Sequence, residues 1–351
     1  MEPVTHFLTG AVLSRAGFNR KAAYATLAMT LAAEAPDLDT LWSIRGPVAA
    51  FQHHRGWTHT FLGLPFEAAI VLGAVYGFHR WRSRGKPAEP MAKGRAPLHW
   101  LRLYGFILVA LLSHLLLDWT NNYGLRPFFP FNPRWYAGSF VFIFEPVIFL
   151  LLLLAFVGPW LFGLINAEVG ERRPLYRGRG WAVFALLGIV ALWGWRYYEQ
   201  QQAIVLARSG EYSGAPVVRV SANPYPVTPF RWHVVVETPT GYQTATADTL
   251  GGTVTTHAPE DAYYWPPTTV ASLVAKRSWL GEAYLDWSSW PVVTDTGLNA
   301  DGSATVTFED LRFLYDIPLI TSRKEAPLSG SVLIDADHRV AEMELDGRVQ
   351  R

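Results

Sequence analysis

Residues Leu101–Asp118 read LRLYGFILVALLSHLLLD and combine the two features on which the predicted fold and site rest. The stretch is almost continuously apolar and is close to the ~20 residues with which a helix crosses a ~30 Å hydrocarbon core. Near its end, His114 and Asp118 are four residues apart, so a helix projects both from one face. We therefore predict a membrane-spanning helix with two potential metal ligands at one end.

Further apolar stretches in the first half of the chain extend this prediction. Three are long enough to span a membrane, namely Phe61–His79, Phe140–Ile165 and Trp181–Tyr197. Any one of them could be a buried helix of a soluble protein, but four together favour a polytopic membrane bundle. Two shorter stretches, Phe7–Ala16 and Ala22–Ala33, predict an N-terminal helical hairpin that turns at Arg15–Lys21.

Basic residues predict the orientation of this bundle, because short basic loops stay in the cytoplasm. They concentrate in two loops, one after the first predicted span (Arg80, Arg82, Arg84, Lys86, Lys93, Arg95, Arg102) and one after the third (Arg172, Arg173, Arg177, Arg179). The loop Trp119–Ser139 and everything after the fourth span are then expected outside the cell membrane.

The second half of the chain has a different pattern. Alternating apolar residues between Gly, Pro, Asn and Asp turns predict strands, for example Arg231–Glu237, Ala304–Phe308 and Val332–Ile334. We therefore predict an α+β protein with a transmembrane helical domain, residues 1–198, and an extracytoplasmic β-rich domain, residues 199–351.

Composition excludes some kinds of site. The chain has no cysteine, so any metal must be held by His, Asp or Glu. The formal net charge is only +1, which gives no reason to expect a nucleic-acid partner.

Candidate ligands gather where polar groups should be fewest, since seven of the ten histidines precede residue 120. In the predicted topology, candidates from four segments reach the outer side: His6; Asp37 and Asp39; His53, His54 and His59; His114 and Asp118. Imidazole and carboxylate suit a divalent ion, zinc or else manganese, and the set could hold one or two ions. The sequence leaves open whether Asp37 or Asp39, and His53 or His54, is the ligand.

Three residues are predicted to act in catalysis. Asp118 could bridge two metals, which clamp the attacking and leaving oxygens of a phosphoryl transfer, and the attacking water is expected between the metals near His59, His114 and Asp118. Arg55 offers a planar fork of donors to a phosphate oxygen. Glu145 is ionisable at membrane depth and is a further candidate ligand, although it could instead tie off backbone groups freed by Pro146.

About the first 150 residues resemble the YdjM-like family of bacterial inner-membrane proteins, regarded as metal-dependent hydrolases. The matching pieces are Thr5-His6 with Gly10, Pro36-Asp37-Leu38-Asp39, His54-Arg55-Gly56-Trp57-Thr58-His59-Thr60, His114-Leu115-Leu116-Leu117-Asp118, Asn122-Tyr123-Gly124 and Phe144-Glu145-Pro146. The resemblance implies a multi-pass protein of the bacterial inner membrane.

This family is in turn distantly similar to zinc-dependent phospholipases C and single-strand-specific zinc nucleases. The resemblance implies one metal held by Asp37 (or Asp39), His59, His114 and Asp118, and a second shared by His6 and Asp118. The His-His-Glu set that holds another zinc in those enzymes is missing, and His54 and Glu145 are the candidates to replace it.

The sequence thus predicts a membrane-bound metal-dependent hydrolase of phosphoesters. Because the ligands fall near the membrane interface, membrane lipids are expected partners and a phospholipid is an expected substrate. One alternative is a non-catalytic protein in which metal cross-links the helices and the β domain binds an envelope partner. Another is a transporter with Glu145 and His114 as an ion relay.

Overall fold

The computed structural model describes residues 1–85, 95–168, 178–212, 214–256, 260–315 and 327–350. The basic residues Lys86, Lys93, Arg172, Arg173 and Arg177, used above for orientation, lie outside these ranges. The chain forms two compact units. The first contains Met1–Leu38 and Arg55–Arg196, and the second contains Asp39–His54 and the chain from Tyr197 onward.

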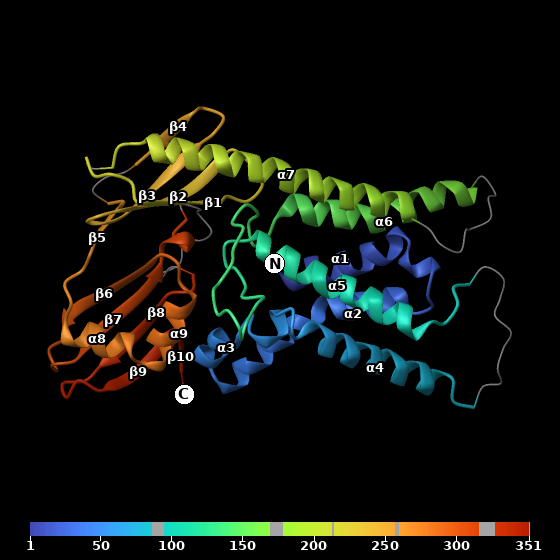
Figure 1. The fold of residues 1–351 in the computed structure, drawn as a ribbon, viewed down its shortest axis with the longest axis horizontal. Coiled ribbons are helices and arrows are strands. Elements are labelled where there is room, and N and C mark those ends of the chain that lie inside the picture. Colours follow the sequence, from blue (N-terminus) through green and yellow to red (C-terminus); the bar gives the residue numbers. More distant parts are fainter. Residues whose placement is uncertain (86–94, 169–177, 213, 257–259, 316–326, 351) are drawn as a thin grey trace. The chain divides into compact units, whose positions relative to one another are not determined.

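The first unit is helical and the second is built mainly on β-sheets, so the predicted α+β class is confirmed (Figure 1). The helices of the first unit are α1 (Pro3–Ala16), α2 (Ala25–Glu34), α4 (Leu64–Arg82), α5 (Trp100–Thr120) and α6 (Pro146–Glu168). The long helix α7 (Arg179–Ser209) belongs to the first unit as far as Arg196.

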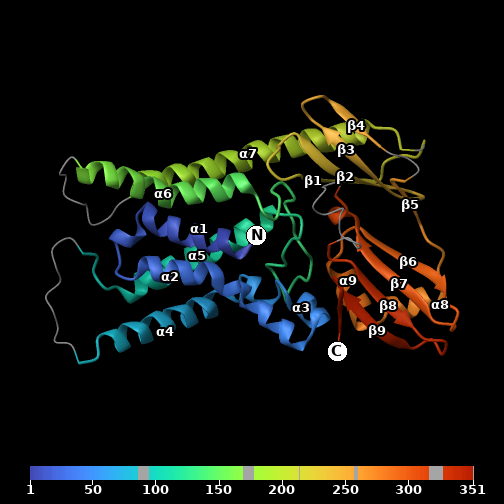
Figure 2. The ribbon, with the colours of Figure 1, turned by 180° about the vertical axis from the view of Figure 1, so that it is seen from behind.

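The predicted N-terminal hairpin is confirmed, because α1 and α2 pack side by side (Figure 2). Gly10 of α1 allows their close approach. A Cβ atom at this position would lie 2.5 Å from the carbonyl oxygen of Met29 and 2.7 Å from Cβ of Ala33. Small residues at such crossings are typical of helices that pack in membranes.

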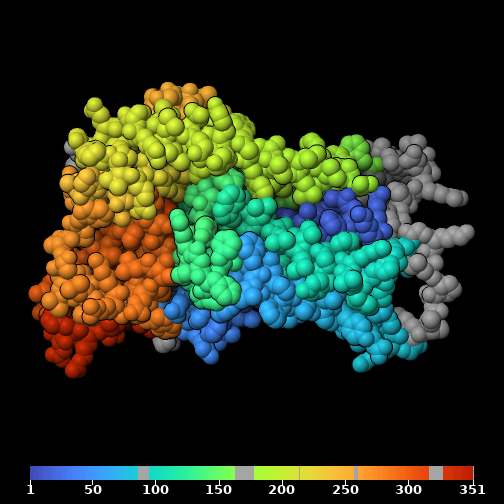
Figure 3. All heavy atoms as spheres, viewed as in Figure 1, coloured from blue at the N-terminus to red at the C-terminus, as the bar shows by residue number. Residues whose placement is uncertain are grey.

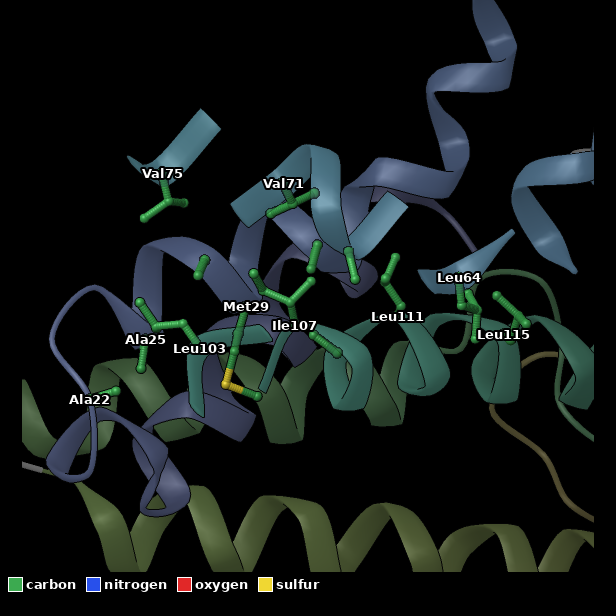
Figure 4. Packing of buried hydrophobic residues seen from close by; sticks show 14 of the residues in the cluster. Ala22, Ala25, Met29, Leu64, Val71, Val75, Leu103, Ile107, Leu111 and Leu115 are labelled. Carbon is green, nitrogen blue, oxygen red and sulfur yellow. The ribbon is translucent and has the colours of Figure 1, made fainter. Parts of the chain in front are cut away.

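The core of the first unit lies where α2, α4 and α5 meet. Figure 4 shows Met29 of α2 among apolar side chains of the other two helices. The buried members that it labels on those helices are Leu64, Val71 and Val75 of α4, and Leu103, Ile107, Leu111 and Leu115 of α5. The face of α5 that packs on this core also fixes where His114 and Asp118 lie.

Helix α6 packs against the first part of α7 through glycines. The added Cβ of a residue at position 158 would touch the ring of Trp181, and one at position 188 would touch Leu151. Residues 121–145 lead from α5 to α6, and the middle of this segment lies at the surface (Figure 3, green), whereas Asn121, Asn122 and Glu145 near its ends are buried. This segment lines one side of the site described below.

The prediction of four spans is not confirmed. In the described residues only α5 and α7 are long and apolar enough to cross a membrane, or three spans if α4 and the bent segment before it are counted as one. Helix α4 carries Glu67 and ends in Arg80 and Arg82. Helix α6 runs from Pro146, six positions after the predicted start at Phe140, to Glu168, and its part with described side chains, Pro146–Phe162, counts as a shorter apolar helix.

The second unit contains two antiparallel five-stranded sheets. One has the order β1-β2-β3-β4 with β5 paired to β3, the strands being Arg219–Pro224, Arg231–Thr238, Gly241–Asp248, Thr253–Thr255 and Ala262–Tyr264. The other has the order β10-β9-β8-β7-β6, the strands from β6 to β10 being Pro291–Leu298, Ala304–Asp310, Gly330–Ile334, Val340–Leu345 and Arg348–Val349. The three strands predicted from the sequence are confirmed as β2, β7 and β8.

The described part of the second unit also contains the end of α7, from Tyr197, and the helices α3 (Pro47–His53), α8 (Val270–Lys276) and α9 (Trp279–Trp287). Helix α8 packs on β6, β7 and β8. Helix α3 packs on α9, where the ring of Phe51 lies 5.7 Å from that of Tyr284 and 5.0 Å from that of Trp287. The segment Asp39–His54 therefore belongs to the second unit although it interrupts the helical part of the sequence.

Candidate metal centre

Four side chains of the first unit converge at the C-terminal end of α5. Helix α5 supplies His114 and Asp118 from consecutive turns, as their spacing predicts. His59 is the last residue of the single-turn 3-10 helix Trp57–His59, and Asp37 lies in the 3-10 segment that follows α2. His59, His114 and Asp118 are fully buried, while the side chain of Asp37 is 15% exposed.

The donor atoms of these residues have the spacing of a tetrahedral ligand set. Nε2 of His59 and Nε2 of His114 are 3.0 Å apart. Oδ2 of Asp118 lies 3.3 and 3.4 Å from these two nitrogens, and Oδ1 of Asp37 lies 3.6 Å from each. Donors about 2.0–2.2 Å from a tetrahedral zinc are about 3.3 Å apart. The four residues therefore fit one divalent ion, with all donors within 4.8 Å of one another.

Backbone and hydroxyl partners orient both imidazoles. Nδ1 of His114 lies 2.7 Å from the carbonyl oxygen of Ala33, and Nδ1 of His59 lies 3.0 Å from Oγ1 of Thr58. A carbonyl only accepts, so Nδ1 of His114 must carry the proton and its Nε2 presents a lone pair. This is how metal-binding histidines are usually held.

The other oxygen of Asp118 is surrounded by positive groups. Oδ1 lies 2.8 Å from a guanidinium nitrogen of Arg55, and the amino group of Met1 also contacts it. Arg55 is buried and donates to the carbonyl oxygen of Gly124 at 2.8 Å and to Oδ1 of Asn121 at 3.3 Å. Arg55 therefore fixes the orientation of Asp118 and joins it to the loop that follows α5.

His6 lies next to the four-residue group without belonging to it. Its ring stacks on that of His114 at 3.8 Å between centroids, and its Nε2 is 3.3 Å from Oδ1 of Asp118. The side chain is fully buried, and neither ring nitrogen makes a hydrogen bond. A second ion beside Oδ1 would meet the charge of Arg55, so the geometry favours a single ion.

Electrostatics keep Asp37 in the ligating form. Burial acts to raise the pKa of its carboxyl group. The hydrogen bond with His59 and the proximity of His114 and His6 outweigh burial, and the pKa falls below its usual value. Asp37 is thus a carboxylate at neutral pH.

The remaining predicted ligands lie elsewhere. Asp39 and His54 are in the second unit and contact each other, with 3.0 Å between Oδ1 and Nδ1. Glu145 is fully buried and pairs with Arg196 of α7 at 2.6 Å. The sequence left two choices open: of Asp37 and Asp39, Asp37 joins the four-residue group, and of His53 and His54, neither belongs to it.

Sequence reasoning missed three supporting residues. Thr58 orients the ligand His59, and Asn121 accepts a hydrogen bond from Arg55, which in turn holds the ligand Asp118. In the sequence, only the closeness of Thr58 and Asn121 to predicted ligands could have indicated these roles. Arg196 was detectable, because a charged residue inside an apolar stretch usually has a buried partner.

Comparison with known proteins is consistent with this site. Residues 1–203 match the model of the YdjM inner membrane protein family. The chain belongs to this family. It is 28% identical over 163 residues to the uncharacterized protein YfhP of Bacillus subtilis (strain 168), a match that covers 44% of this chain and 45% of YfhP. The chain thus spans less than half the length of that relative. No solved structure matches the chain.

Membership extends over the whole helical unit and so includes every residue of the four-residue group. It also makes the chain an inner-membrane protein, in agreement with the two helices that can cross a membrane.

Proposed function

We propose that this member of the YdjM family is a membrane-bound, metal-dependent hydrolase of phosphoesters. One divalent ion, zinc or manganese, is held by Asp37, His59, His114 and Asp118. The observation that supports this most strongly is the nearly tetrahedral spacing of four donors, three of which belong to fully buried residues.

When bound, such an ion acts as a Lewis acid on a phosphoryl oxygen and lowers the pKa of water toward neutrality. The residues of the chain prepare the site for this. Arg55 holds Asp118 through Oδ1 and leaves Oδ2 for the ion. Asp37 is the only partly exposed member of the group, so substrate and water approach on its side.

In the proposed topology, α4 to α7 are four spans, the site lies on the extracytoplasmic face, and the chain after α7 is outside. A substrate in the membrane interface, such as a phospholipid, would then present its phosphate to the site. Support for this comes from the position of His114 and Asp118 at one end of the spanning helix α5.

A purely structural metal site is the second candidate. Four protein donors, three of them fully buried, resemble a closed structural site, whereas catalysis needs an open coordination position. In that case the metal cross-links helices, and the second unit would bind an envelope partner.

Cobalt substitution separates the two functions. The purified chain in detergent, loaded with Co²⁺, is titrated with inorganic phosphate while its visible spectrum is recorded. An open site changes its spectrum as phosphate enters, and the same protein with zinc or manganese should cleave bis(p-nitrophenyl) phosphate or a short-chain phospholipid. The spectral response to phosphate and the cleavage of these substrates should both be lost in His59→Ala. Both should be kept in His99→Ala, since His99 is an exposed residue outside the four-residue group.

An unchanged spectrum together with no cleavage of either substrate would favour the structural role. Cleavage that survives in His59→Ala would contradict the proposed site.

A further inference from the structure

A face of one sheet in the second unit changes from apolar to polar along its strands. Val235 of β2 and Tyr242 of β3 pack with Trp290 and Leu311 in a buried cluster. Further along the same face, the side chains are Arg231 and His233 on β2 and Thr244 and Thr246 on β3. The register places them together, since His233 pairs with Thr246, and Thr246 pairs with Thr255 of β4.

These polar residues line a cavity of about 390 Å³. Its wall also includes Tyr225 and Asp261. His233, Tyr225 and Thr244 are buried, with 4%, 4% and 8% of their surfaces exposed. Buried polar groups lining a cavity are unusual in a part built only for packing, and this size is within the range of small-ligand sites.

The hydrogen-bonding groups of the cavity can both donate and accept. Nε2 of His233 lies 2.7 Å from the carbonyl oxygen of Leu311, so Nε2 carries the proton and Nδ1 is an acceptor. The hydroxyl groups of Thr244, Thr246 and Thr255 each offer a donor and two acceptor positions. A ligand rich in hydroxyl groups suits such a lining, because every hydroxyl also donates and accepts.

The charges at the cavity narrow the class of ligand. Arg231 and Asp261 contribute opposite charges, so the cavity does not favour a phosphate or another anion. The rings of Tyr225 and Tyr315 lie 5.4 Å apart, and that of Tyr315 lies 5.1 Å from His233. The guanidinium of Arg231 lies over the ring of Tyr225, 4.5 Å from its centre, and both tyrosine rings are buried, so they hold the polar wall in place and leave the contacts with the ligand to Arg231, His233 and the threonine hydroxyl groups.

From these features we infer that the second unit binds a neutral saccharide in the cavity formed by β2, β3 and β4. An extended peptide is less suited, because peptides that bind sheets usually add to an edge strand, and this cavity lies on a face. The proposed site is separate from the metal centre and does not depend on the hydrolase function.

Calorimetric titration of the full chain in nanodiscs tests this inference. The probes are maltotetraose and the N-acetylglucosamine tetramer, with tetraalanine and inorganic phosphate for comparison. We expect at least one saccharide to bind, with and without a metal chelator. In Thr246→Val, which keeps the side-chain shape, Kd should rise about three- to tenfold through loss of hydrogen bonding.

Matched variants control for folding. Thr294→Val makes the same change at an exposed position of β6 in the other sheet and should leave Kd unchanged. If Thr246→Val unfolds at a lower temperature than the wild type, Thr255→Val at an exposed position of β4 replaces it. Binding of neither saccharide would overturn the inference, and so would unchanged affinity in a folded Thr246→Val or binding of tetraalanine or phosphate alone.

Discussion

Nε2 of His59 lies 3.0 Å from Nε2 of His114, with both rings fully buried. Because His114 carries its proton on Nδ1, its Nε2 presents a lone pair toward the other ring. Either a proton on His59 or a cation must lie between the two nitrogens. Oδ2 of Asp118, 3.3 Å and 3.4 Å from them, makes a cation the better occupant, since two imidazoles and a carboxylate together attract positive charge.

Metal removal should therefore lower stability. At an ion concentration about 1,000-fold above Kd, binding contributes about 4 kcal/mol to folding, and a chelator removes this contribution. The test measures the thermal unfolding midpoint of the purified chain with and without chelator, and we expect the chelator to lower it. His59→Ala should show a low midpoint in both conditions, and His99→Ala should behave like the wild type. Equal midpoints for the wild type with and without chelator would contradict the metal site.

Arg55 should tune metal affinity without being a ligand. Arg55→Gln removes the group that fixes Oδ1 of Asp118, and loss of such a supporting residue typically costs 10–100-fold in metal affinity. Competition with a zinc indicator measures the change. Arg134→Gln, at an exposed arginine of the loop after α5, is the control. An affinity equal to that of the wild type would show that Asp118 is held without Arg55.

Glu145 should contribute to stability and not to metal binding. Glu145→Gln leaves the buried guanidinium of Arg196 without its counter-charge, which typically costs 3–5 kcal/mol when one partner of a buried pair is removed. Replacing both residues by leucine and methionine should restore much of the loss. Thermal unfolding measures stability, and elemental analysis measures metal. A drop in metal content in the folded double variant would restore Glu145 as a ligand.

Gly10 should be intolerant of side chains. Gly10→Val pushes α1 away from Met29 and Ala33 of α2, and overpacking of this kind costs typically 1–3 kcal/mol. Gly105→Val on α5 is the matched control, because nothing lies within 4 Å of a Cβ added there. Detergent stability assays compare the two. Equal losses would mean that helix propensity, and not packing, accounts for the effect.

The second unit should lose stability in mild acid through His233. Burial lowers its pKa, although the hydrogen bond to Leu311 and the charges of Asp261 and Asp310 act in the opposite direction. In the unfolded chain the histidine has its usual pKa of about 6.5, so below pH 6.5 the unfolded chain binds more protons than the folded one. The contribution of neutral His233 to stability is therefore fully present above about pH 6.5 and is lost as the pH falls below it. Thermal midpoints between pH 7.5 and pH 5.5 should decline less in His233→Gln than in the wild type.

Much of the fold was predictable from residue patterns. The helix around Leu101–Asp118 and the strand Arg231–Glu237 follow from local periodicity and are present. The number of spans is not settled by hydropathy alone, because α4, with Glu67 in its first turn, qualifies as a span only together with the bent segment before it, and the described side chains of α6 end at Phe162.

The candidate site was predictable in its ligands and not in its surroundings. The spacing of His114 and Asp118 fixes their common face, whatever the rest of the chain does. The choice between Asp37 and Asp39 depends on how the 3-10 segment Ala35–Arg45 turns, which local sequence does not determine. The roles of Arg55 and Glu145 depend on tertiary partners, Asp118 and Arg196, and so needed coordinates.

The insertion of Asp39–His54 into the second unit has a consequence for dissecting the protein. A chain truncated after α7 would keep α3 but lose Tyr284 and Trp287, leaving the ring of Phe51 uncovered. This segment runs from Asp37 to Arg55, so its misfolding would displace the candidate ligand Asp37 at one end and Arg55, which orients Asp118, at the other. Truncation after α7 would therefore disturb the candidate metal centre although it removes none of the residues of that centre.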